Sequence, residues 1–265
     1  MKQKTIQHDV TLSGIGIHSG QQCWLTISPA PVNHGIVFSL NRKNFPATAS
    51  LVKETRRGTT VGEIAVTEHF LAATYCLGVD NLLVSLSASE LPIMDGSALP
   101  FVTALEDAQL IEQAADKNVF VTAKEFSFSA NNSTLTLLPY RGLKVDFMVK
   151  FPVIGEQRCQ IELNPAVFKQ EIAPARTFGY IEEYELLKEQ GLGRGASLEN
   201  ALVLSQNGYL NQPRFVDELV RHKVLDLLGD LALLGRPILG EIKAVRSGHQ
   251  LNIELVRRLL NYDPT

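Results

Sequence analysis

Cysteine is scarce in this sequence and follows no pattern. The 265 residues include only three cysteines, Cys23, Cys76 and Cys159, and no two of them have the C-x-x-C spacing of redox or metal motifs. An odd number of scattered cysteines argues against a disulfide framework and is typical of proteins from a reducing compartment. We therefore expect a cytoplasmic protein.

The sequence also lacks an apolar stretch long enough to cross a membrane. Its most apolar stretch, residues 224–240, is interrupted by Asp226, Asp230 and Arg236, whereas a spanning helix needs about 20 mostly apolar residues. The basic N-terminal residues are not followed by the apolar run of a signal peptide. The sequence predicts neither a membrane span nor a secretion signal.

Neither sign of charge is in large excess. The formal net charge is −3, so we expect no electrostatic attraction to nucleic acid or to an anionic membrane. The glycine-rich segment 191–197 lacks the Gly-Lys-Ser/Thr ending of a P-loop, which argues against nucleoside triphosphate chemistry. Apolar residues make up 45% of the chain, as in a globular protein with a sizeable core.

The order of predicted elements occurs twice along the chain. Each half contains strands, then a helix that carries a histidine and ends near a glycine, then an apolar strand and a second helix. The helix, strand and helix are predicted at residues 68–77, 82–86 and 101–108, and again at 217–234, 238–245 and 252–260. The repeated order predicts an α+β fold of two similar domains from a duplicated unit, residues 1–122 and 123–265.

The helix predicted at residues 217–234 carries two candidate metal ligands. His222 and Asp226 are four residues apart, so they project from the same face of a helix, one turn apart. An isolated H-x-x-x-D pair is more often an exposed polar face. Here most neighbouring residues are leucine or valine, and an unpaired charge buried among them would be costly. A metal ion would give both side chains a partner.

A histidine beside an acid, Glu68-His69, occurs in the first half. Adjacent side chains on a helix point about 100° apart, so we expect them to divide the work. His69 would bind the metal, and Glu68 would act as a general base on the attacking water. Two imidazoles, one carboxylate and an open fourth position are the ligands of a hydrolytic zinc site. This combination predicts a metal-dependent hydrolase.

Two further residues have two interpretations each. Thr177 follows Pro174 in a predicted loop, where its hydroxyl can donate to an oxyanion or can cap the following helix. His249 follows Ser247-Gly248 in a predicted turn, where residues are often functional. A turn histidine without any role is about equally common.

Six motifs occur in order along nearly the whole chain. They are G-I-G-I-H-S-G at 14–20, T-E-H at 67–69, P-I-M-D-G-S at 92–97, A-R-T-F-G at 175–179, R-H-K-x-x-D-x-x-G-D at 221–230 and S-G-H at 247–249. Together they closely resemble the UDP-3-O-acyl-N-acetylglucosamine deacetylase family, the zinc enzymes of lipid A biosynthesis. The resemblance implies two domains whose sheets sandwich the helices, in the order β-α-α-β.

The resemblance also implies roles for the catalytic residues. They are zinc ligand for His69, His222 and Asp226, general base for Glu68, oxyanion donor for Thr177, proton donor for His249 and orienting carboxylate for Asp230. Whether His249 or protonated Glu68 delivers the proton to the leaving amine stays open. Iron or cobalt also suits a His-His-Asp set.

For the substrate, the resemblance implies a UDP-linked acylated glucosamine. Lys223 and Phe178 would contact its sugar and nucleotide portion. An insert near residues 192–203 would form an apolar passage for the acyl chain, with Leu192, Ala201 and Val203 in its wall. We expect a monomer that uses no nucleic acid partner.

The implied reaction is hydrolysis of the 2-acetamido group to a free amine and acetate, the committed step of lipid A biosynthesis. Two alternatives stay open. One is a zinc amidohydrolase that acts on a different N-acylated sugar, and the other is a catalytically silent binding protein that keeps the sugar contacts and the apolar passage. The intact set of catalytic residues argues against the silent protein, because a retired site usually loses one of them.

Overall fold

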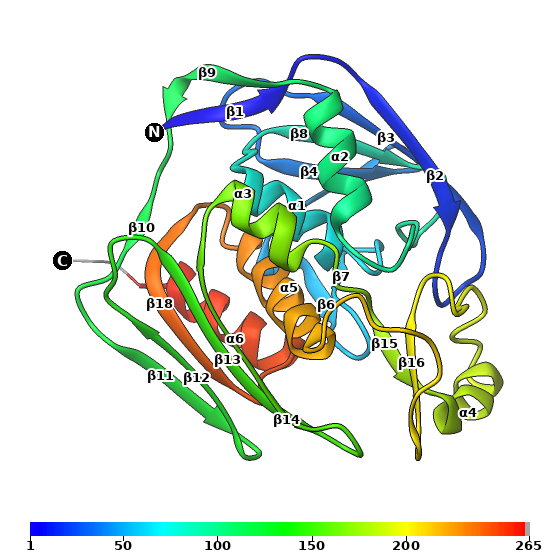
Figure 1. Cartoon of the computed structure of the whole chain (residues 1–265). Helices are drawn as coiled ribbons and strands as arrows, with labels where there is room; N and C mark the ends of the chain where they lie inside the picture. The colour runs from blue at the N-terminus through cyan, green and yellow to red at the C-terminus, as the bar shows by residue number, and fades with distance from the viewer. Residues whose placement is uncertain (263–265) are drawn as a thin grey trace.

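The computed structural model describes residues 1–262, with helices lying between two sheets (Figure 1). The first half contains β2 (Val10–Ile15), β3 (Gln22–Pro29), β4 (Ile36–Leu40), β5 (Lys43–Pro46), α1 (Glu68–Leu77), β8 (Leu82–Leu86) and α2 (Leu99–Asp107). The sheet order is β2-β3-β8-β4-β5, and β4 and β8 run parallel. Phe70 on α1 contacts Phe38 on β4 and Phe101 on α2, which joins these elements in one core.

The second half repeats this arrangement. It contains β11 (Phe126–Ala130), β12 (Ser133–Leu138), β13 (Leu143–Phe151), β14 (Gly155–Leu163), α5 (Glu218–Ala232), β18 (Ile238–Val245) and α6 (His249–Leu260). Its order, β11-β12-β18-β13-β14, matches the first sheet strand for strand, and β13 and β18 form the parallel pair. The predicted α+β fold is confirmed, and the shared topology supports a duplicated unit.

Shorter elements complete the two halves and the crossing between them. They are β1 (Lys2–Ile6), a 3-10 turn at Ala49–Leu51, β6 (Val52–Glu54), β7 (Thr60–Val61), β9 (Leu110–Asp116), β10 (Phe120–Val121), α3 (Pro165–Val167) and a π-helical turn at Phe168–Ile172. Strand β9 pairs with β1, whereas β10 pairs with β18 of the second sheet. The chain therefore crosses between the halves after β9, and a domain boundary at residue 122 stays a prediction. Among residues 1–262, no helix has the length and apolarity needed to cross a membrane.

A small unit with its own sheet protrudes at one side (Figure 1). It contains β15 (Phe178–Tyr180), a 3-10 turn at Ile181–Glu183, α4 (Tyr184–Glu189), β16 (Leu202–Ser205) and β17 (Gly208–Tyr209). The insert predicted near residues 192–203 is part of this longer segment. Its backbone is tied to the first half, because the Gly195 N–H donates to the Ile17 carbonyl at 3.0 Å. The unit is thus part of the second half in sequence but also contacts the first half.

The two halves meet where α1 packs against α5. A Cβ atom placed on Gly229 of α5 would lie 2.1 Å from the backbone carbonyl oxygen of Glu68 on α1. Only a residue without a side chain permits this approach of the two helix backbones. The close crossing brings the Glu68-His69 pair beside the polar residues of α5.

Replacing Gly229 by alanine should therefore push the two helices apart. We expect the free energy of unfolding to fall by about 1–3 kcal/mol, as for other overpacked core positions. Denaturant titration would measure it. Gly179→Ala is the matched control, because a Cβ atom there meets nothing within 4 Å. Equal stability of the two variants would contradict this account of the crossing.

Candidate metal centre and active site

Four polar side chains follow one another at four-residue intervals on α5: Glu218, His222, Asp226 and Asp230. With 3.6 residues per turn, this spacing places them along one face of the helix. All four are buried. Because buried polar groups are costly without partners, each of the four needs a counterpart from another element.

The three predicted metal ligands come together. His222 Nε2 lies 3.3 Å from Asp226 Oδ1, and His69 Nε2 lies 4.0 Å from the same oxygen. One ligand atom from each residue lies within 4.8 Å of the others. Tetrahedral zinc with bonds of about 2.0–2.1 Å needs ligand atoms roughly 3.3 Å apart. The three side chains thus fit a divalent metal ion after a small inward movement.

The protonation of these groups suits metal binding. Burial lowers the pKa of His69 to about 3 and also lowers the pKa of His222. Both imidazoles are therefore neutral and have a free lone pair. His222 Nδ1 lies 3.1 Å from the Ala175 carbonyl, an N–H acceptor that leaves Nε2 unprotonated toward the cluster. Burial would raise the pKa of Asp226, but nearby His222 and Lys223 lower it, so the carboxylate is ionised.

Glu68 lies beside the three ligands. Its carboxylate accepts a hydrogen bond from the Thr59 backbone N–H at 3.0 Å. Glu68, Asp226 and His249 each place one polar atom within 4.8 Å of the others. Burial raises the pKa of Glu68 to about 7, with Asp226 adding to the shift and His249 opposing it. A carboxyl group with a pKa near neutrality can both accept and return a proton.

His249 faces this carboxyl group and is held by a polar network. Its Nδ1 lies 2.8 Å from Asp230 Oδ2, which also accepts from Asn252 Nδ2 at 2.8 Å, while Thr59 Oγ1 donates to Asp230 Oδ1 at 2.6 Å. Burial alone would lower the pKa of His249, but the carboxylates of Asp230 and Asp226 raise it to about 9. His249 is therefore an imidazolium at neutral pH, and Asp230 orients it.

The prediction that His249 lies in a turn is wrong. It is the first residue of α6, which begins three residues earlier than predicted. Gly248 takes the extended conformation of a helix N-cap, so the chain turns directly into the helix. Pattern analysis missed this start because it follows the apolar residues of a helix and His249 and Gln250 are polar.

Thr177, Phe178 and Lys223 also surround the cluster. All three line the same cavity. Lys223 Nζ lies 5.8 Å from the centroid of the Phe178 ring and pairs with the Asp226 carboxylate. Strand β15 begins directly after Thr177, and the 3-10 turn that follows this strand has Tyr180 as its N-cap. Thr177 therefore does not cap a helix, and its position at the cavity favours the oxyanion interpretation.

The cavity has a volume of about 490 Å³. Its polar end is formed by Glu68, His69, His222, Asp226 and His249. Apolar side chains line much of the rest. Most of them belong to the protruding unit: Ile181, Tyr184, Leu187, Leu198, Ala201 and Val203. The first half adds Ile17, Val66 and Ile93. Of the three residues predicted for the acyl passage, Ala201 and Val203 line the cavity, whereas Leu192 is not part of the lining.

Sequence reasoning missed the contribution of α4 to this wall. Tyr184 and Leu187, one helical turn apart, face the cavity. The helix also carries Glu185, Lys188 and Glu189, a composition typical of an exposed surface helix. The only signal in the sequence was the i, i+3 spacing of the two large side chains.

Comparison with known proteins agrees with this geometry. Residues 3–261 match the model of the family described as UDP-3-O-acyl N-acetylglycosamine deacetylase. A UDP-3-O-acyl-N-acetylglucosamine deacetylase from Myxococcus xanthus is 42% identical, with 99% of this chain and 87% of the relative covered. A protein of the same name from Pseudomonas entomophila is also 42% identical, with 98% and 90% covered.

Proposed function

The chain belongs to the UDP-3-O-acyl N-acetylglycosamine deacetylase family. We propose that it deacetylates its sugar substrate with the help of a zinc ion bound by His69, His222 and Asp226. The reaction is hydrolysis of the 2-acetamido group of UDP-3-O-acyl-N-acetylglucosamine to a free amine and acetate, the committed step of lipid A biosynthesis. The observation that carries this proposal is the convergence of the three ligands, Glu68 and His249 at the polar end of one apolar cavity.

The residues around the ligands divide the work of amide hydrolysis. A zinc ion held by these residues would supply a Lewis acid for the amide carbonyl and would lower the pKa of the attacking water to about 7. Glu68 accepts the proton of this water. Thr177 donates a hydrogen bond to the oxyanion that develops on the carbonyl, an interaction typically worth about 3 kcal/mol.

Collapse of the tetrahedral species requires a proton on the leaving amine. His249 carries that proton at neutral pH, since Asp230 and Asp226 hold its pKa at about 9. Glu68, protonated in the first step, is the second group able to deliver it. In both cases Asp230 keeps the His249 ring in place through the bond to Nδ1.

The cavity wall supports the assignment of the substrate. Lys223 and Phe178 lie beside the metal ligands, where they can contact the sugar and nucleotide portion. The acyl chain lies along the apolar side of the cavity, with Ala201 and Val203 in the wall. Leu192 is not among the lining residues, and its place in the passage rests on the family resemblance alone.

Burial of the acyl chain predicts a strong dependence on the 3-O-acyl group. Ten buried methylenes would contribute about 8 kcal/mol before ordering costs. We expect kcat/KM for the sugar without its acyl group to be at least roughly a hundredfold lower, measured side by side under the same conditions. Ala201→Trp, which fills the passage, should slow only the acylated sugar. Comparable rates for the two sugars would refute the proposal that the apolar side of the cavity binds the acyl chain.

Chelation tests the function itself. Purified protein should deacetylate UDP-3-O-acyl-N-acetylglucosamine, lose activity on chelation and regain it with added zinc. Parallel tests with iron and cobalt would show how strongly the His-His-Asp set prefers zinc over these two metals. No activity in any metal state, on a sample that binds zinc, would redirect the proposal to a different N-acylated sugar.

We also propose that the protein is a cytoplasmic monomer. All three cysteines, which lie within the described residues, are free thiols, as is typical of reducing compartments. The groups that the reaction needs come from one chain. Light scattering of the purified protein would test the oligomeric state.

A further inference from the structure

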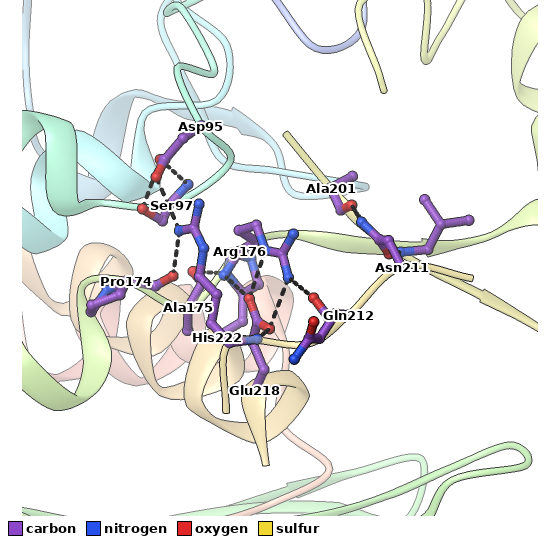
Figure 2. A network of polar contacts seen from close by, with 12 residues as sticks. Asp95, Ser97, Pro174, Ala175, Arg176, Ala201, Asn211, Gln212, Glu218 and His222 are labelled. Carbon is purple, nitrogen blue, oxygen red and sulfur yellow. Dashed lines mark hydrogen bonds and ion pairs between the residues drawn. The ribbon is translucent and has the colours of Figure 1, made fainter. Parts of the chain in front are cut away.

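A buried ion pair lies directly beside the metal ligands and has no part in the reaction described above. Arg176 and Glu218 join through two side-chain bonds, Nε to Oε1 at 2.9 Å and Nη2 to Oε2 at 3.2 Å (Figure 2). The Arg176 backbone N–H also donates to Glu218 Oε1 at 2.9 Å. Both side chains are buried, so their charges must be compensated within the protein.

The surrounding groups complete this compensation. Arg176 Nη2 donates to the Gln212 carbonyl at 2.8 Å, and the Arg214 backbone N–H donates to Glu218 Oε2. Burial would raise the pKa of Glu218, but the bonds from Arg176 and from the two backbone amides bring it below its ordinary value. The pair is therefore a fully bonded, ionised unit.

This unit is connected to the metal centre by two short routes. Arg176 follows Ala175, whose carbonyl accepts from His222 Nδ1 at 3.1 Å (Figure 2). Glu218 is one helical turn before His222 on the same face of α5. The loop is thus connected to α5 at two points one helical turn apart. The ion pair joins Arg176 to Glu218, and a hydrogen bond joins the Ala175 carbonyl to His222.

The same loop is also tied to the first half of the chain. Arg214 Nη1 donates to the Pro174 carbonyl at 2.8 Å and lies 3.0 Å from Asp95 Oδ2. The Thr177 backbone N–H donates to the Gly96 carbonyl at 2.7 Å. Residues 174–177 are therefore held from both halves, and both the ion pair and the bond from His222 to the Ala175 carbonyl connect them to α5.

We propose that Arg176 and Glu218 are positioning residues of the metal centre. They hold the Ala175 carbonyl against His222 Nδ1, so that Nε2 points at the ion, and they keep Thr177 at the cavity. With this role for Glu218, all four polar side chains on one face of α5 contribute to the site: Glu218, His222, Asp226 and Asp230. This inference rests on the proposed metal site at His69, His222 and Asp226.

Arg176→Lys tests the proposal, because lysine keeps the charge but cannot form the two-pronged bond. The readout is the dissociation constant for zinc alone, measured by competition with a chromogenic chelator. Loss of a group that orients a metal ligand typically weakens metal binding by about 10–100-fold, and we expect a weakening in that range. The matched control is Arg158→Lys, which alters the two-pronged Arg158–Asp146 pair between β13 and β14. Its zinc affinity should equal that of the unaltered protein.

A second measurement separates positioning from general stability. Melting temperatures are compared without metal and with saturating zinc, for Arg176→Lys and for Glu218→Gln. A positioning role predicts a smaller increase on zinc addition than in the unaltered protein, because the increase follows the affinity. A lower metal-free melting temperature with an unchanged increase would overturn the proposal, as would unaltered zinc affinity in Arg176→Lys. Failure of the unaltered protein to bind zinc would instead refute the metal site itself.

Discussion

Replacing His222 by alanine is expected to abolish tight zinc binding and to lower kcat by more than roughly 10⁴-fold. Without the metal, the pKa of the attacking water stays far above the value of about 7 that a bound zinc ion would give it. Among the proposed ligands, His222 has the best defined geometry, with Nε2 3.3 Å from Asp226 Oδ1 and Nδ1 held by Ala175. The substitution takes one neighbour away from the buried Asp226 carboxylate, which keeps its ion pair with Lys223. The measurement is zinc content by atomic absorption together with the deacetylation rate.

The control for this variant is His8→Ala, at an exposed position outside the site. It should retain full zinc content and rate. Circular dichroism should show the same helix content for His222→Ala as for the unaltered protein. A variant that binds one equivalent of zinc and turns over at the normal rate would rule out His222 as a ligand.

Glu68→Gln is expected to lower kcat by about 10³-fold while zinc stays bound, within the usual range for loss of a general base. Glutamine has the shape of glutamate and can still accept the hydrogen bond from the Thr59 backbone N–H, but it cannot take a proton from water. The burial that raises the pKa of Glu68 to about 7 also means that the neutral side chain is well tolerated. Single-turnover deacetylation and zinc content measure the two effects.

Glu54→Gln is the matched control, since Glu54 is a partly exposed carboxylate of the same half whose partner is Arg56. Its rate should be normal. The contrast between His222→Ala, which loses metal and rate together, and Glu68→Gln, which loses rate alone, separates a ligand from a base. Loss of zinc in Glu68→Gln would move Glu68 into the ligand set.

Hydrophobic periodicity predicted the elements that carry the site with good accuracy. The bounds of α1, β8 and β18 coincide with the prediction, because each is a short apolar run ended by a glycine or a polar turn. The pairing of His222 with Asp226 was also predictable, since it depends only on the helical repeat. Roles for Thr177 and Lys223 came from the resemblance of six motifs, which the comparisons agree with at the level of the family.

Other features depend on contacts between segments far apart in the chain. His69 reaches the proposed ligands on α5 only because Gly229 lets two helix backbones meet. The Arg176–Glu218 pair could not be predicted from the sequence, since a charged residue on a helix is expected to be exposed unless its partner is known. The same reason hid the contribution of α4 to the cavity, which Tyr184 and Leu187 face among charged neighbours.

By itself, the sequence determined the local structure and the chemical repertoire of this protein: which segments are helices and strands, and which side chains can bind a metal or move a proton. These properties follow from backbone periodicity and from functional groups, which are local. The tertiary structure alone decided which of those groups meet, how deeply they are buried and therefore what their pKa values are. Burial and electrostatic coupling depend on distances in space, and close packing between the two halves sets those distances.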